Sequence, residues 1–102
     1  MPTQVLVTTQ DRSRYLAEYL QLAKMLRGEG ISTEVYLEPH ALRDQIGYAS
    51  ANGIVFAVIA GESEFGQNNV TVKDLVQRRQ ETISQDSLIG YIRGRLSATC
   101  DQ

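Results

Sequence analysis

Seven apolar residues follow one another at Ile54–Ala60, in the order IVFAVIA, between Gly53 and Gly61. A short, near-continuous apolar run bounded by glycines is typical of a strand that is buried on both faces of a sheet. It is also the longest apolar run of the chain, and a membrane-spanning helix needs about 20 such residues. The sequence therefore predicts the central strand of a mainly parallel sheet and no membrane span.

The residues before this run alternate between the patterns of strands and helices. Val5–Thr8 and Thr33–Leu37 are rich in β-branched residues, as short strands are. Between these two strands, apolar residues recur at helical spacing over about residues 12–27. Gly28 or Gly30 can end this helix in a left-handed conformation.

A second helix is predicted between Thr33–Leu37 and the central run. Pro39 suits its first turn, where the missing N–H of proline is harmless, and Gly53 closes it. Its predicted inner face consists of Leu42, Ile46 and Ala49. The order strand, helix, strand, helix, strand implies two right-handed crossovers and a parallel core.

The remainder of the chain breaks this alternation. Residues 61–68 are polar and are predicted to form a turn-rich loop, and Val70 and Val72 alternate with polar residues in a fourth strand. Because the loop is too short for a parallel crossover, this strand is expected to run antiparallel. A fifth strand is predicted at Arg79–Ile83, and Ser84 can cap a last helix. The predicted inner face of that helix is Leu88, Ile89, Ile92 and Leu96.

These elements predict one α/β domain with three layers, α/β/α. Its mixed five-stranded sheet combines a parallel β-α-β-α-β core with an antiparallel strand, and three helices flank the sheet. The length of 102 residues agrees with a single domain. The net charge of −2 and a hydrophobic content of 42% are those of a globular protein.

Charge and cysteine content limit the classes of partner and metal site that the chain could have. Residues 65–95 hold five basic and three acidic side chains, although the whole chain is slightly acidic. This balance argues against tight, sequence-independent nucleic-acid binding and leaves room for a weaker contact through the C-terminal third. Cys100 has no partner for an internal disulfide, so we expect a reducing, cytoplasmic setting. Cys100 and His40 alone cannot supply a zinc site, and no metal ligands are predicted.

A ligand is expected at the carboxyl ends of the parallel strands, where three polar loops meet: residues 9–12, 38–40 and 61–64. No glycine-rich phosphate loop follows the first strand, so a dinucleotide or nucleoside triphosphate site is not expected. Glu62 and Glu64 would point the same way on an extended backbone, which suggests either acid–base chemistry or a solvated turn. No nucleophile or cofactor site is identifiable, and no catalytic residue is assigned.

The fourth strand offers a different kind of site. Thr71 and Lys73 should share one side of this strand, opposite Val70 and Val72. Beside Glu64, they would present hydrogen-bond donors and acceptors to unstacked bases, which is how proteins read single-stranded RNA loops. The pair Arg78–Arg79 is either a phosphate contact or a solvated turn.

Three segments give the chain a resemblance to a known family: Val35–Pro39 (VYLEP), Gly53–Glu64 (GIVFAVIAGESE) and Val70–Leu75 (VTVKDL). Together with the helix exit at residues 26–31, they resemble the C-terminal anticodon-binding domain of histidyl-tRNA synthetases. The likeness covers residues 4–96, which we take as the domain, and leaves 97–102 as a tail. Glycyl-, threonyl- and prolyl-tRNA synthetases share this fold, a mixed five-stranded sheet flanked by three helices.

The resemblance implies a domain that holds the anticodon loop of a tRNA for a separate catalytic domain. Its acidic loop and basic strand residue correspond to Glu62, Glu64 and Lys73, and Glu38 and Arg43 border the same surface. The implied partners are the tRNA anticodon stem-loop and the catalytic domain of a parent histidine–tRNA ligase, which could also supply a dimer contact. No catalytic core fits within this chain, and no cofactor is expected.

Two other functions remain open from the sequence. The same fold serves as a scaffold in synthetase-like regulators, so a regulatory or protein-interaction module without tRNA specificity is the alternative. A small flavodoxin-like enzyme or receiver domain fits less well, because it needs a carboxylate cluster at the strand ends. Only Asp11 lies near the end of the first strand, and the central strand ends at Ala60–Gly61 without an aspartate.

Overall fold

A computed structural model describes residues 3–100, and the side chains of residues 3–96. The five strands are β1 (Val5–Val7), β2 (Thr33–Val35), β3 (Phe56–Ile59), β4 (Asn69–Asp74) and β5 (Arg79–Ser84). The helices are α1 (Arg12–Gly28), α2 (Leu42–Ala51), α3 (Glu62–Gly66) and α4 (Leu88–Cys100), with a 3₁₀ turn at Gln85–Ser87. Over this range, no helix has the length and apolarity that a membrane crossing requires.

The strands form one sheet in the order β2-β1-β3-β4-β5. β1 pairs in parallel with both β2 and β3, whereas β4 pairs antiparallel with β3 and with β5. The predicted fold class, with its parallel core and antiparallel addition, is therefore confirmed. The predicted antiparallel direction of the fourth strand follows from its short connection to the third.

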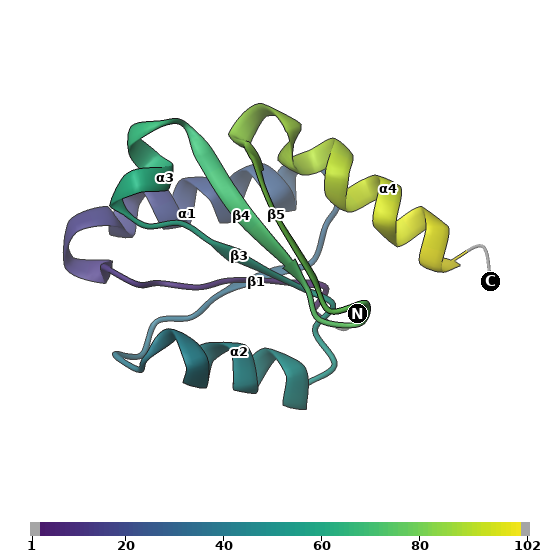
Figure 1. Ribbon diagram of the computed structural model, residues 1–102, viewed down its shortest axis with the longest axis horizontal. Helices are drawn as coiled ribbons and strands as arrows, with labels where there is room; N and C mark the ends of the chain where they lie inside the picture. The colour runs from purple at the N-terminus through teal and green to yellow at the C-terminus, as the bar shows by residue number, and fades with distance from the viewer. Residues whose placement is uncertain (1–2, 101–102) are drawn as a thin grey trace.

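The helices cover the two faces of the sheet unequally (Figure 1). α1 and α4 lie on one face, and the main hydrophobic core beneath them holds Val58, Val70 and Val72 from the middle strands. Leu88 and Ile92 of α4 are fully buried there, as predicted for its inner face. α2 lies on the other face over a smaller cluster of Leu6, Ala49 and Ile54, so the β4–β5 half of that face has no helix above it in Figure 1.

The structure corrects the predicted loop at residues 61–68. Its first part is the short helix α3, which makes four α-helices within residues 3–100 instead of the predicted three. The Glu64 side chain accepts a hydrogen bond from the Gly61 N–H at 2.7 Å, which satisfies one of the free donors at the helix start. Phe65 packs the helix against the core: its ring centroid lies 4.7 Å from that of Tyr15 and 5.4 Å from that of Tyr19.

The boundaries of the second helix also differ from the prediction. α2 begins at Leu42 after an extended Ala41, so Pro39 lies in the preceding loop and not in the first turn. The predicted closure at Gly53 agrees with its positive φ of 71°, and Gly30 has a φ of 81° just beyond α1. α4 continues to Cys100, into the segment set apart as a tail, and the domain boundary at residue 96 stays a prediction.

Candidate functional site

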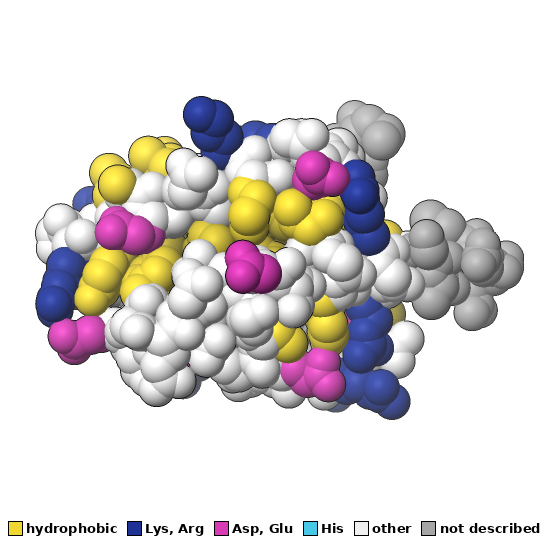
Figure 2. Space-filling model, turned by 90° about the horizontal axis from the view of Figure 1, so that it is seen from above, with side chains coloured by type: hydrophobic (Ala, Val, Ile, Leu, Met, Phe, Trp, Pro, Cys, Tyr) yellow, Lys and Arg dark blue, Asp and Glu magenta, His cyan; other side chains and the backbone are white. Residues whose placement is uncertain are grey.

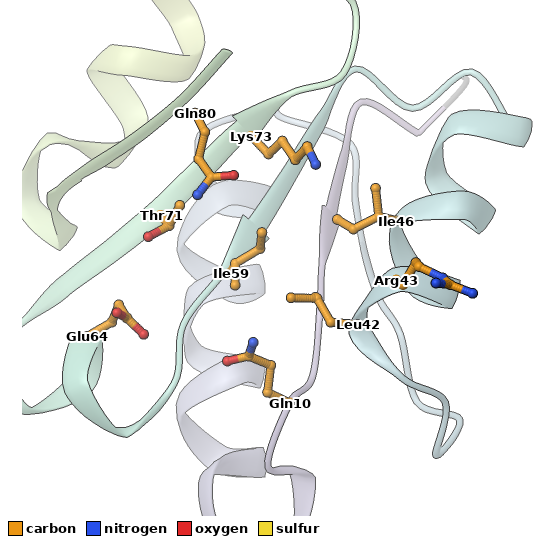
Figure 3. A pocket seen from close by; sticks show the side chains of 9 residues that line it. All are labelled: Gln10, Leu42, Arg43, Ile46, Ile59, Glu64, Thr71, Lys73 and Gln80. Carbon is orange, nitrogen blue, oxygen red and sulfur yellow. The ribbon is translucent and has the colours of Figure 1, made fainter. Parts of the chain in front are cut away.

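A cavity of about 500 Å³ opens on the sheet face that carries α2, between this helix and the strands β3 to β5 (Figure 3). It therefore lies at the half of the face that no helix covers. Its lining consists of Gln10, Leu42, Arg43, Ile46, Ile59, Glu64, Thr71, Lys73 and Gln80. The apolar members come from β3 and α2, whereas the polar groups come from β4, β5, α3, the loop after β1 and, with Arg43, α2 itself.

The strand register supplies part of the polar wall. Ala57 is paired with Lys73 and Lys73 with Gln80, so these residues form one row across three strands. Thr71 lies in the next row, and its hydroxyl is 2.9 Å from that of Thr82. Val70 and Val72 point into the core on the other side of the sheet. The predicted common orientation of Thr71 and Lys73, beside Glu64, is confirmed.

The helix α3 separates the two glutamates that the sequence placed together. Two residues along an α-helix are about 200° apart around its axis, so Glu62 and Glu64 point in different directions. Glu64 lines the cavity, whereas Glu62 forms an ion pair with Arg14 at 3.1 Å. The backbone here is helical and not extended, so the condition under which both side chains would point the same way is not met.

Of the two site residues predicted around the start of the second helix, Glu38 and Arg43, one lines the cavity. Arg43 is part of the lining, although its guanidinium points away from the other labelled side chains (Figure 3). Glu38 is exposed in the preceding loop, where its carboxylate is 3.7 Å from His40 Nε2. Burial raises the pKa of the neighbouring Tyr36 hydroxyl, and the charges of Glu38 and Asp44 raise it further. The structure thus brings Arg43, Glu64 and Lys73 together and leaves Glu38 outside.

A second hollow of about 430 Å³ adjoins the cavity at the turn between β4 and β5. Arg78 and Arg79 line it, and it shares Lys73 and Gln80 with the first cavity. Asp74 stabilises the turn, because its carboxylate accepts hydrogen bonds from the N–H groups of Val76 and Gln77 at 3.0 and 2.9 Å. Four basic side chains, Arg43, Lys73, Arg78 and Arg79, therefore border one continuous surface, next to the acidic Glu64.

Buried polar contacts hold the loops that surround the cavity. Gln45 of α2 is fully buried, and its amide bonds the Thr9 N–H at 2.8 Å and the Thr9 carbonyl at 2.9 Å. The same amide donates to the His40 carbonyl at 2.9 Å. Gln45 was not among the predicted site residues, although its helical spacing from Leu42 and Ala49 puts a polar residue on the inner face of α2.

The arrangement suits recognition of an unstacked base. Leu42, Ile46 and Ile59 offer an apolar surface, and Glu64 and Lys73 offer an acceptor and a donor at its edge. Among the residues that the structure describes, no cluster of three or more His, Cys, Asp or Glu side chains could hold a metal ion. The chemistry that the cavity supports is hydrogen bonding and packing.

A family model and the sequences of known proteins identify the same family for this chain. A family model described as "Anticodon binding domain" matches residues 4–95. The histidine–tRNA ligase of Stenotrophomonas maltophilia is 39% identical over 93 residues, which cover 91% of this chain and 20% of that protein. The corresponding ligase of Rhodopirellula baltica is 39% identical over 85 residues, or 78% of this chain and 19% of that protein. The chain thus spans about a fifth of the length of these relatives.

Solved structures show the same likeness. The crystal structure of histidyl-tRNA synthetase from Nostoc superposes with a TM-score of 0.89 at 31% identity, covering 94% of this chain and 23% of that one. The RNA-binding domain of threonyl-tRNA synthetase from Cryptosporidium parvum gives a TM-score of 0.83 at 17% identity, over 91% of this chain and 23% of that one. At this lower identity, the second likeness concerns the fold alone.

Proposed function

The chain belongs to the anticodon-binding domain family, and we propose that it binds the anticodon stem-loop of a histidine tRNA. In this proposal it acts as one domain of a histidine–tRNA ligase and holds the tRNA while a separate catalytic domain of that protein joins histidine to its end. The chain itself contributes binding and positioning. The single cysteine fits a reducing compartment, and the cytoplasm is the setting we propose.

One observation carries this proposal: Glu64 of α3, Lys73 of β4 and Arg43 of α2 line a single cavity at the uncovered half of the sheet. RNA loops are read through bases that leave the stack, lie on flat or apolar side chains and form hydrogen bonds along their edges. The ligase relatives at about 40% identity support the choice of histidine tRNA.

We assign roles by position and charge. Lys73 donates to a base carbonyl or neutralises a phosphate, and Glu64 accepts from a base amino or imino group. Arg78 and Arg79, beside the same surface, contact phosphates of the loop. Glu38 and Glu62 lie outside the cavity, so we propose that neither reads a base.

The distribution of charge predicts modest affinity. The chain carries a net charge of −2, and Figure 2 shows both signs of charge on the side of α3 and α4. Binding therefore depends on the few basic residues near the cavity, and it should weaken steeply as the salt concentration rises.

The direct test compares the two lysines of the chain. Lys73→Ala should lower the affinity for a histidine-tRNA anticodon stem-loop about fivefold to tenfold at low salt. It should also reduce the slope of log K against log salt by about 0.7, because one cation leaves the interface. Fluorescence anisotropy with a labelled stem-loop measures both quantities.

Lys24→Ala is the matched control, because Lys24 is an exposed residue of α1 on the opposite face. It should change the affinity less than twofold, and both variants should keep their urea midpoints. Equal effects of the two variants, or binding of a scrambled loop as tight as that of the anticodon loop, would contradict the proposed function.

A further inference from the structure

The backbone at Gln10 is fixed from several sides. The hydroxyl of Tyr19, which is fully buried, accepts hydrogen bonds from the N–H groups of Gln10 and Asp11 at 3.2 and 3.3 Å. It donates to the Ala60 carbonyl at 2.8 Å, so one side chain ties the loop after β1 to the end of β3. On the other side of Gln10, Thr9 is held by its two bonds to Gln45. These hydrogen bonds therefore hold the main chain at Gln10 in one position.

The side chain of Gln10 is exposed and points into the cavity (Figure 3). Among the described residues, its amide forms no hydrogen bond. An exposed amide on a fixed backbone loses little conformational freedom of the main chain when a ligand binds. This is the arrangement expected of a group that recognises a ligand and not of one that supports the fold.

Gly61 allows Gln10 and Glu64 to approach each other. A Cβ atom at position 61 would lie 2.9 Å from Gln10 Oε1 and 3.3 Å from Glu64 Oε1. The backbone of Gly61 is extended, with φ of −116° and ψ of −164°, so the absence of a side chain is needed for space and not for backbone conformation. Both polar groups therefore face the cavity from the two sides of Gly61.

We propose that Gln10 is a specificity-determining residue, which together with Glu64 reads the edge of one unstacked base of the RNA loop. This inference rests on the proposed function and names a residue that the resemblance does not assign. Glu64 Oε1 already accepts from the Gly61 N–H, which leaves Oε2 for a donor on the base. The Gln10 amide supplies one donor group and one acceptor.

The chemistry of this pair selects a class of base. A carboxylate accepts well from an exocyclic amino group, whereas uracil offers only its imino N–H, between two carbonyl oxygens whose lone pairs would repel the carboxylate. The amide of Gln10 can then pair with the adjacent atoms of the same edge. We infer that the base between Gln10 and Glu64 carries an exocyclic amino group.

The test measures discrimination at each position of the anticodon. The full 102-residue chain is titrated with a histidine-tRNA anticodon stem-loop and with loops in which each anticodon base is replaced in turn by the other three. The unaltered protein should lose about tenfold in affinity when the base read by Gln10 is changed. Gln10→Ala should remove most of this discrimination at that one position and leave the other two positions unchanged.

Two further substitutions separate this role from a structural one. Gly61→Ala should have the same positional signature as Gln10→Ala, because the added Cβ displaces both polar side chains. Gly66→Ala, at the end of the same helix with no atom within 4 Å of its Cβ, is the matched control and should leave discrimination intact. Gln21→Ala is a second control, on an exposed residue of α1.

The outcomes distinguish the two proposals. If the unaltered chain does not distinguish the anticodon loop from a scrambled loop, both the function and the role of Gln10 are wrong. If it does so, and Gln10→Ala weakens all loops equally or none, only the role of Gln10 is wrong. A preference for uracil at the affected position would overturn the assignment of an amino-bearing base.

Discussion

At the residue scale, the buried amide of Gln45 links two of the loops around the cavity. It bonds both main-chain groups of Thr9 in the loop after β1 and the carbonyl of His40 before α2. A buried amide with these partners stabilises one relative position of the loops, and removing it leaves the partners without hydrogen bonds. The shape of the cavity therefore depends on a residue that does not line it.

Replacing this amide should reduce stability. Gln45→Leu keeps a similar volume but leaves the buried N–H of Thr9 unpaired, so the free energy of unfolding should fall by about 2 kcal/mol. A urea titration followed by circular dichroism measures the change. Gln21→Leu, at an exposed position of α1, should change it by less than about 0.5 kcal/mol. An unaltered midpoint for Gln45→Leu would show that water or a rearranged loop satisfies Thr9.

Some residue positions in the site were predictable and others were not. The period of two along a strand was sufficient to put Thr71 and Lys73 on the ligand side and Val72 in the core. Gln10 lies in the loop 9–12 that was predicted at the ligand edge, but neither it nor Gln80 was singled out, because their approach to Glu64 and Lys73 arises only in the folded chain. The buried role of Gln45 depends on acceptors and donors distant in sequence.

At the element scale, the main difference between the prediction and the structure is the helix α3. Five residues give too little sequence for a helical apolar pattern, and the glycines at both ends favour a turn. Its formation depends on tertiary contacts, in which Phe65 packs on the rings of Tyr15 and Tyr19. The consequence for the site is that Glu62 and Glu64 have different surroundings.

This difference predicts unequal effects of two matched substitutions. Glu64→Gln keeps an oxygen that can accept from the Gly61 N–H and removes the charge, and it should lower affinity for the cognate stem-loop about fivefold or more. Glu62→Gln loses only an exposed ion pair with Arg14, and it should change affinity less than twofold. Anisotropy titrations at one salt concentration compare them. A larger effect of Glu62→Gln would contradict the proposed placement of the RNA.

At the scale of the whole molecule, the site results from unequal coverage of the sheet. The order β2-β1-β3-β4-β5 puts the antiparallel pair β4–β5 at one side of the sheet, where α2 does not cover it. The sequence predicted the strand directions from loop lengths and the core from the apolar run at Ile54–Ala60. It did not predict the cavity, because its walls come from five elements and loops that meet only in the folded chain.

In the proposed function, the chain binds the anticodon loop on the sheet face that carries α2 and the exposed side of the β4–β5 pair. The most direct measurement is an NMR titration of the ¹⁵N-labelled chain at low salt with the histidine-tRNA anticodon stem-loop and with the same hairpin carrying a scrambled loop. We expect shifts at Arg43, Glu64 and Lys73 with the cognate loop only, and none at Gln21 or Lys24 of α1. Identical shifts with both hairpins, or shifts confined to α1 and α4, would contradict the proposed function.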